Sequence, residues 1–220
     1  TQIQAALNVS SPGDTVLVYP GRYYENLIIQ TDAISLISME AITGDGEYIN
    51  TTIIDGNQTG RCVQVNQHVH NILIRGFSVT NGFATGGAGG IAMPMNSLGR
   101  LENLRVFGNT AGNGGGLNIG AATVYLAGVK VYNNYALYLG GGLYAAAGGG
   151  YVNSITFDPV NRCSIYNNRS GSGQDIYIQR AVSDLNVYLD TFSVAEPTTY
   201  YAVYLSQGLN NYQMQIDILN

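Results

Sequence analysis

A motif that recurs every 26 residues constrains the fold of this chain more than any other feature. Two glycines followed by an aliphatic residue stand at 89–91, 115–117 and 141–143. Recurrence at this period is typical of repeat proteins, in which each unit is a small module that stacks on the next. A second motif, a short apolar alternation that ends at an asparagine, precedes each glycine pair and returns after a longer loop: it ends at Asn81, Asn109, Asn134 and Asn168.

Each unit contains three short runs in which apolar and polar residues alternate, such as Ile72 and Ile74, or Leu117 and Ile119. A period of two over so few residues indicates strands and excludes helices. Strands with no helices between them can pair in parallel only if the chain coils, with equivalent strands about 4.8 Å apart. The sequence therefore predicts an all-β fold, a single-stranded parallel β-helix (a solenoid) with three parallel sheets and about eight coils.

The repeat also predicts which side chains share the interior. A one-residue slip would turn every apolar side chain of a strand outward, so the register is strongly specified. We expect the glycines at the corner before the third strand, where the chain bends sharply, and the asparagines at the preceding corner, where their amides can form a ladder. The residues expected to stack inward are Ile91, Met93, Leu117, Ile119, Leu143, Ala145, Ile176 and Ile178.

The domain organisation follows the same scheme, with one domain over residues 1–220. Residues 1–12 contain a short amphipathic helix, which we expect to cap the first coil, because an uncapped solenoid exposes sheet edges. Residues 13–180 form the coils, with the clearest repeats over 63–180. Residues 181–220 lose the motif but still alternate, so we expect irregular final coils and a C-terminal cap or docking surface there.

Composition limits the partners. The chain has 220 residues, a net charge of −5 and nine Lys and Arg residues, too few for the basic stripe that nucleic acid or an anionic membrane surface requires. No run of 18 apolar residues occurs, so we expect no membrane insertion. Cys62 and Cys163 lie about four coils apart in this scheme, too far for a disulfide, and both are predicted to be free thiols.

Several stretches resemble the right-handed parallel β-helix superfamily, the architecture of pectate lyases, pectin methylesterases and many surface repeat proteins. "GDTVLVYPGRYYENLII", residues 13–29, resembles the first coil of that superfamily. The "VYNN" and "GGGL" units are similar to the repeats of chlamydial polymorphic outer-membrane proteins and related bacterial adhesins. The C-terminal stretches "DIYIQ", "VYLDTFSV" and "PTTYYAVYLS" are similar to parts of long secreted bacterial β-helix proteins. The resemblance implies a right-handed coil and an extracellular or bacterial cell-surface location, but it does not assign a function, because function depends on sites carried by the fold.

A catalytic centre is not evident in the sequence. The resemblance implies that a lyase would need a cluster of acidic side chains holding Ca²⁺ and an Arg or Lys base, yet the aspartates form no column at the repeat spacing. In an enzyme, Arg105 and Lys130 would form the basic face, and Asp55 or Asp175 would be the nearest acidic candidates. We expect no cofactor, and Ca²⁺ belongs only to the alternative of an enzyme acting on uronate-containing polysaccharides.

Arg105 and Lys130 are also the most interesting binding candidates, because each lies between inward-facing residues and should point outward from one sheet in successive coils. Like charges at this spacing repel unless an anion covers them, and a uronate or a sulfate would suit. The alternative is a pair of solvated side chains, which costs little in water.

Tyrosines and histidines supply two further sets of candidates. Tyr132 and Tyr166 on one sheet, and Tyr144 and Tyr177 on another, should stack outward and either bind sugar rings or stabilise the sheets. His68 and His70 can chelate a metal ion or form hydrogen bonds within a turn; no third ligand is evident, so no metal site is predicted.

The sequence as a whole indicates a non-catalytic, structural or adhesive module of a secreted or surface protein that binds glycans or partner proteins on its outer faces. The alternative is a polysaccharide lyase, esterase or hydrolase. A polysaccharide or a cell-surface protein is the expected partner, and self-association through a solenoid end is a third possibility.

Overall fold

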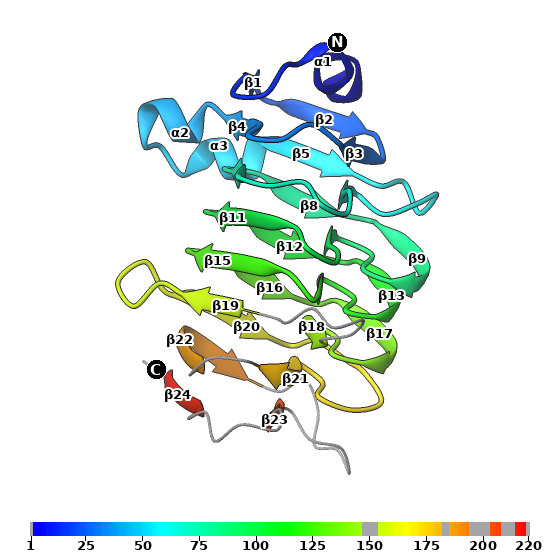
Figure 1. The fold of residues 1–220 in the computed structure, drawn as a ribbon, viewed down its shortest axis with the longest axis vertical. Helices are drawn as coiled ribbons and strands as arrows, with labels where there is room; N and C mark the ends of the chain where they lie inside the picture. The colour runs from blue at the N-terminus through cyan, green and yellow to red at the C-terminus, as the bar shows by residue number, and fades with distance from the viewer. Residues whose placement is uncertain (1, 147–153, 182–184, 194–202, 208–213, 219–220) are drawn as a thin grey trace.

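The computed structural model describes residues 2–146, 154–181, 185–193, 203–207 and 214–218 (Figure 1). These residues wind into a parallel β-solenoid of about six turns, which confirms the expected fold class. The sequence predicts about eight turns, and within the described residues the three long sheets contain six, eight and seven strands. Two short helices, α2 (Glu40–Thr43) and α3 (Glu47–Thr51), lengthen the second turn.

Three long parallel sheets form the faces of the solenoid. Sheet A contains β1 (Thr15–Val18), β4 (Ser35–Ser38), β7 (Ile72–Arg75), β11 (Leu98–Glu102), β15 (Thr123–Ala127) and β19 (Ser154–Phe157). Sheet B contains β2 (Gly21–Tyr24), β5 (Thr52–Asp55), β8 (Ser78–Thr80), β12 (Arg105–Phe107), β16 (Lys130–Tyr132), β20 (Cys163–Tyr166), β22 (Leu185–Ser193) and β24 (Met214–Ile218). Sheet C contains β3 (Leu27–Ile29), β6 (Val63–Val65), β10 (Ile91–Met93), β14 (Leu117–Gly120), β18 (Leu143–Ala146), β21 (Ile176–Ala181) and β23 (Val203–Gln207).

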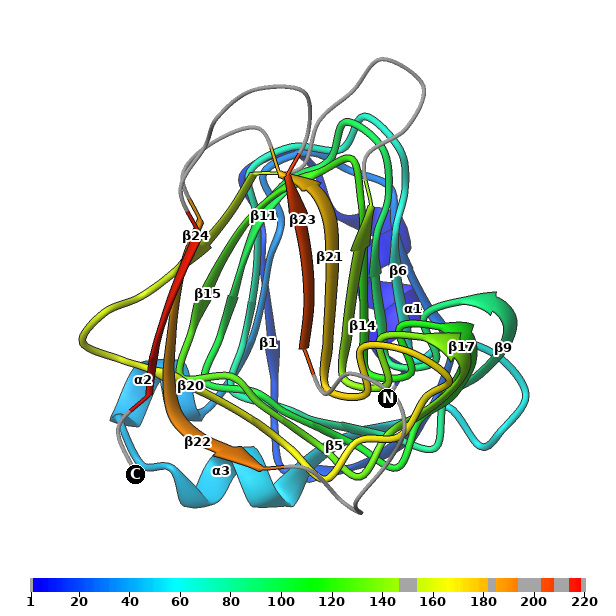
Figure 2. The same ribbon diagram turned by 90° about the horizontal axis from the view of Figure 1, so that it is seen from below.

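A fourth, three-stranded sheet was not expected. Sheet D lies between sheets B and C in each turn that contains it and projects from the coil, as Figure 2 shows for β9 and β17. Its strands are β9 (Phe83–Gly87), β13 (Thr110–Asn113) and β17 (Tyr135–Leu139).

The interior is built from apolar columns along the solenoid axis. Leu117 pairs with Leu143 and Ile119 with Ala145, and all four side chains are buried. Seen along the axis, the strands of successive turns lie over one another (Figure 2). The inward stacking predicted from the repeat is therefore confirmed on sheet C, from Ile91 through to Ile178.

The glycines of the repeat serve two different purposes. Gly114 has a φ of +63°, a left-handed conformation that glycine adopts without a steric penalty, and Gly140 and Gly173 repeat it in later turns. Gly115 and Gly116 instead allow close approach: a Cβ on Gly115 would lie 2.5 Å from the carbonyl oxygen of Tyr135 in the next turn. A side chain at either of these two positions would force neighbouring turns apart.

An amide ladder runs through the corner between sheets B and D. The Nδ2 of Asn109 donates to Oδ1 of Asn134 at 3.0 Å, and the Nδ2 of Asn134 donates to Oδ1 of Asn168 at 3.0 Å. The expectation that Asn81 belongs to this column is wrong by one residue, because Phe83 pairs with Thr110 and Gly82 therefore takes the ladder position. Asn81 instead occupies the position one residue before the ladder, which has a positive φ in each of these turns. The equivalent residues are Gly108, Asn133 and Asn167.

The ladder ends at a buried carboxyl group. Asp175 precedes Ile176, which pairs with Leu143, so it takes the corner position that Gly142 has one turn earlier. Its Oδ1 accepts hydrogen bonds from the backbone N–H and the Nδ2 of Asn168, at 3.0 and 2.8 Å. Desolvation by burial raises the pKa of Asp175 to about 6.

The N-terminal cap is confirmed as a helix, α1 (Ile3–Val9), which buries Ile3 and Leu7 against the first turn. The carboxylate of Glu25 accepts hydrogen bonds from the first helical amides, those of Ile3 and Gln4, at 2.8 and 2.9 Å. At the other end, β22, β23 and β24 continue sheets B and C, with one register shift between β20 and β22 and another between β21 and β23. Apart from these strands and Ala181, which ends β21, the segment 181–220 lies outside the described residues.

The two cysteines are buried and free, as predicted. Of the described helices, none is long and apolar enough to cross a membrane.

Candidate functional site

A groove of about 870 Å³ crosses the outer face of sheet B. Its upper wall is the helical insertion, residues 40–51, and its lower wall is the loop of residues 158–162 that follows β19. Both walls project from the same side of the solenoid (Figures 1 and 2). The residues lining the groove are Asp45, Gly46, Glu47, Ile49, Asn103, Leu104, Arg105, Gly128, Lys130, Pro159, Val160, Asn161, Arg162 and Asp190.

The floor of the groove carries two positive charges. Arg105 on β12 pairs in register with Lys130 on β16, so the two side chains leave the sheet side by side, as the repeat predicts. Lys130 is exposed and Arg105 half-buried. Within the described ranges neither side chain forms an ion pair. Two adjacent cations without a counter-ion attract an anion.

The upper wall is fixed to the sheet by local hydrogen bonds. Gly44, with a φ of +74°, ends α2, and the Oδ1 of Asp45 accepts the backbone N–H of Glu47 at 2.9 Å, which starts α3. The carbonyl of Ile49 accepts a hydrogen bond from the Ser78 hydroxyl of β8 at 2.8 Å. Sequence reasoning missed these helices, although Gly44 just after an apolar turn and Asp45 just before Glu47 are signals for a helix end and a helix start.

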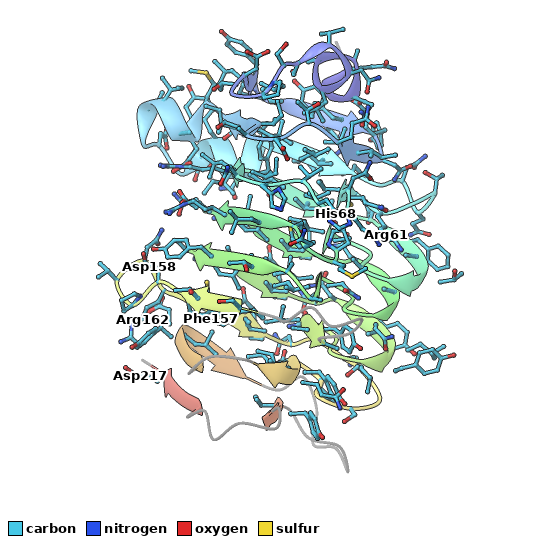
Figure 3. All side chains as sticks on the ribbon, viewed as in Figure 1. Arg61, His68, Phe157, Asp158, Arg162 and Asp217 are labelled. Atoms are coloured by element: carbon cyan, nitrogen blue, oxygen red, sulfur yellow. The ribbon has the colours of Figure 1, made fainter. Side chains whose placement is uncertain are left out.

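The lower wall is organised by Asp158. Its Oδ1 accepts the amides of Val160 and Asn161, at 2.8 and 2.7 Å, and its Oδ2 accepts the hydroxyl of Tyr125. These hydrogen bonds hold the pKa of Asp158 below its usual range, and the bond from Tyr125 has the largest effect. Arg162 forms an ion pair with Asp217 at 3.1 Å, and Figure 3 shows Asp158, Arg162 and Asp217 on the same side of the molecule.

One asparagine joins the two walls. Asn103 donates its Nδ2 to Oε1 of Glu40, the first residue of the helical insertion, at 2.7 Å, and its Oδ1 accepts the Nδ2 of Asn161 at 2.9 Å. Glu40 is buried and held by Arg75 at 2.9 Å. The width of the groove therefore depends on a continuous chain of side-chain hydrogen bonds. Sequence reasoning did not identify Asn103, because the equivalent corner positions of the neighbouring turns are the glycines Gly76 and Gly128, which carry no polar side chain.

Carboxylates stand around the cationic floor. Asp45 and Glu47 belong to the upper wall, and Asp190 of β22 lies at the lower end. In the described part of the chain, no three His, Cys, Asp or Glu side chains are close enough to hold a metal ion. The groove can hold an anion by charge and hydrogen bonding.

The two acidic catalytic candidates lie apart from this floor. Asp55 is on sheet B, but β8 separates its strand from Arg105, and its carboxylate is buried, paired with Arg22 and hydrogen-bonded by the Nδ2 of Asn81 at 3.0 Å. Asp175 is buried at the end of the amide ladder, at the start of a sheet C strand. The structure brings neither acid together with Arg105 and Lys130.

The candidate tyrosines form outward stacks. Tyr132 stacks on Tyr166 with ring centroids 5.1 Å apart, and Phe107 extends this stack at the same spacing. Tyr144 stacks on Tyr177 at 5.6 Å, and Tyr204, which the sequence did not single out, extends that stack. Because the rings lie face to face, a ligand alongside either stack meets mainly ring edges and hydroxyl groups. The stack of Phe107, Tyr132 and Tyr166 adjoins the cationic floor, two residues further along the same strands.

The two histidines have different neighbours. The Nδ1 of His68 lies 2.9 Å from the Nδ2 of Asn96, whereas the Nδ1 of His70 lies 3.9 Å from Oδ1 of Asp32. They belong to no cluster of metal-binding side chains among the described residues.

The groove on sheet B is thus the site at which the candidates Arg105 and Lys130 meet, and their adjacent charges can attract an anion there. Comparison of the chain with protein-family models, with curated proteins and with solved structures gives no match.

Proposed function

We propose that this protein is a non-catalytic binding module that holds an acidic glycan in the groove over sheet B. The observation that carries the proposal is the adjacency of Arg105 and Lys130, without described counter-ions, on the floor of a walled groove. A sugar carboxylate or sulfate between them accepts hydrogen bonds from a guanidinium and an ammonium group, which are the stronger, charge-assisted kind.

The walls favour such a ligand in two ways. They exclude part of the solvent, which strengthens the attraction between the floor and an anion. They also carry polar groups for sugar hydroxyls, among them the side chains of Asn103 and Asn161. The edges and hydroxyls of Tyr132 and Tyr166 lie along the same face and extend the polar contact surface.

We prefer binding to catalysis because the two acidic catalytic candidates from the sequence lie apart from the cationic floor and are engaged with other residues. Asp55 is ion-paired with Arg22, and Asp175 accepts two hydrogen bonds from Asn168. The similarity of the repeat units to bacterial surface proteins supports an extracellular role, in which a rigid solenoid presents the groove away from the cell. A polysaccharide of the surroundings, or a glycan on a partner surface, is the proposed ligand.

Titration calorimetry with an oligogalacturonate and with a neutral oligosaccharide of equal length tests the proposal. We expect the acidic ligand to bind at least about tenfold more tightly, and Arg105→Ala and Lys130→Ala each to weaken it about three- to tenfold. Added salt should weaken binding, because the contact is electrostatic. Arg100→Ala is the matched control, since Arg100 is paired with Glu102 on sheet A, and it should keep full affinity.

Equal affinity for the two ligands, or unchanged binding by Arg105→Ala, would contradict the proposal. The same samples with Ca²⁺, followed by the ultraviolet absorbance of unsaturated uronates, should give no signal. A rise in absorbance that Arg105→Ala removes would replace binding with catalysis as the function.

A further inference from the structure

The charges of the groove alternate along the solenoid axis. Arg105 and Lys130 form a positive centre, and carboxylates lie on both sides of it. Asp45 and Glu47 stand on the upper wall, where Asp45 accepts the Glu47 amide and Glu47 accepts the Nδ2 of Asn50. Asp190 stands at the lower end, and the third cation of the groove, Arg162, is already paired with Asp217. The carboxylates of Asp45, Glu47 and Asp190 form no ion pair with any described residue.

The strand order sets the scale of this pattern. The helix that carries Glu47 is bonded to β8, which pairs with β12, so the upper wall lies on the N-terminal side of Arg105 along the axis. Asp190 belongs to β22, two strands beyond Lys130, or roughly 10 Å along the axis at about 4.8 Å per strand. A sugar acid on the floor therefore places its neighbouring sugars beside the carboxylates of the rim.

The chain of hydrogen bonds through Asn103 fixes the two walls, so the pattern of charge is formed before a ligand arrives. A densely charged polyanion would place like charges against Asp45, Glu47 and Asp190, and repulsion at the rim would offset attraction at the floor. A ligand whose acidic group is flanked by ammonium groups is attracted both by the floor and by the rim.

We infer that the glycan is zwitterionic, with unsubstituted amino groups on sugars next to its uronic acid. This inference rests on the proposed function and narrows it from acidic glycans in general to those with free amines. It also assigns the rim residues Asp45, Glu47 and Asp190 a role in ligand selection.

The test compares two octasaccharides of alternating glucuronate and glucosamine that differ only in their amines. In one all amines are free, and in the other all are N-acetylated. Titrations at a pH of about 6.5, where the free amines are protonated, should show the free-amine form binding about three- to tenfold more tightly to the wild type. Sulfated dextran should bind more weakly than the free-amine octasaccharide.

Variants separate this inference from the proposed function. The triple variant Asp45→Asn, Glu47→Gln, Asp190→Asn keeps an oxygen acceptor at each position and should lose the preference between the octasaccharides. Arg105→Ala should weaken the binding of both octasaccharides. Equal binding of the two octasaccharides to the wild type, or an unchanged preference in the triple variant, overturns the zwitterionic ligand and leaves acidic-glycan binding standing. If Arg105→Ala changes neither titration, the proposed function itself fails.

Lys130 supplies a direct readout, because it is the only lysine of the chain. Reductive methylation with ¹³C keeps its charge and yields one side-chain signal in the groove, besides that of the terminal amine. The free-amine octasaccharide should shift this signal at lower concentration than the acetylated form. A signal that neither ligand moves would place binding elsewhere and contradict both proposals.

Discussion

At the scale of single residues, Asp175 couples the fold to pH. The pKa of this buried carboxyl is about 6, above the value of about 3.9 for an unfolded aspartate. The folded protein therefore holds the proton more tightly than the unfolded chain. The resulting stabilisation is fully present below pH 4 and is lost as the pH rises through 6. Two pKa units correspond to a change on the order of 3 kcal/mol.

Asp175→Asn should remove this pH dependence. The amide oxygen can still accept the two hydrogen bonds from Asn168, while the group no longer ionises. Urea unfolding at pH 4.5 and pH 7 should show the variant gaining stability relative to the wild type at the higher pH, by up to about 3 kcal/mol. If both proteins change in parallel between the two pH values, Asp175 is not the group responsible.

Two glycines of one turn should respond very differently to a methyl group. A Cβ on Gly115 would meet backbone oxygens of the next turn at 2.5 and 2.6 Å, whereas one on Gly120 would have only the side chain of Asn118 near it, at 3.7 Å. We expect Gly115→Ala to lower the free energy of unfolding by about 1–3 kcal/mol or more and Gly120→Ala to change it by less than about 0.5 kcal/mol. Chemical denaturation of both variants checks this contrast, and similar losses would mean that contact with the next turn is not the cause.

At the scale of elements, the strands could be predicted and the walls of the groove could not. Alternation and the 26-residue spacing place Leu117 against Leu143 and Arg105 against Lys130, because parallel stacking repeats the same contact in every turn. The helical insertion and the 158–162 loop occur once each, so no periodicity marks them. Their shape depends on particular long-range hydrogen bonds, such as those of Asn103. The cationic floor was therefore predictable, while its enclosure was not.

The 158–162 loop should depend on one carboxylate. Asp158→Ala removes the acceptor for two loop amides and for the Tyr125 hydroxyl. Asp158→Asn keeps one side-chain oxygen, which can still accept some of these hydrogen bonds. Hydrogen exchange of the amides of Val160 and Asn161 should accelerate in the alanine variant, less so in the asparagine variant, and not at Leu117 in the core. Unchanged exchange in Asp158→Ala would show that the loop is held by other contacts.

At the scale of the whole molecule, the two cysteines report on opposite parts of the solenoid. Cys62 lies near the N-terminal end and Cys163 in β20, and burial raises the pKa of each to about 12. Neither thiol should react in the native state. A solenoid is held together mainly by contacts between neighbouring turns, so each thiol should become reactive when its own part of the stack opens.

Loss of the cap should therefore affect the two thiols unequally. Glu25→Ala removes the acceptor for the first amides of α1 and should loosen the first turns. Thiol labelling over a urea series should then show Cys62 exposed at a lower concentration than in the wild type, with Cys163 nearly unchanged. Equal shifts for the two thiols would mean that the solenoid unfolds as one cooperative unit.

The register of sheet C has a consequence for how such a molecule can change in length. Leu117 and Leu143 hold equivalent places, so loss of residues 118–143 would bring Tyr144 directly after Leu117, where Asn118 now stands. The chain would be shorter by one layer of about 4.8 Å, and its remaining layers would still meet suitable partners. Insertion of the same segment would lengthen it by an equal step. The length of the solenoid is thus quantised, and gain or loss of a single layer is the smallest change that keeps the strands in register.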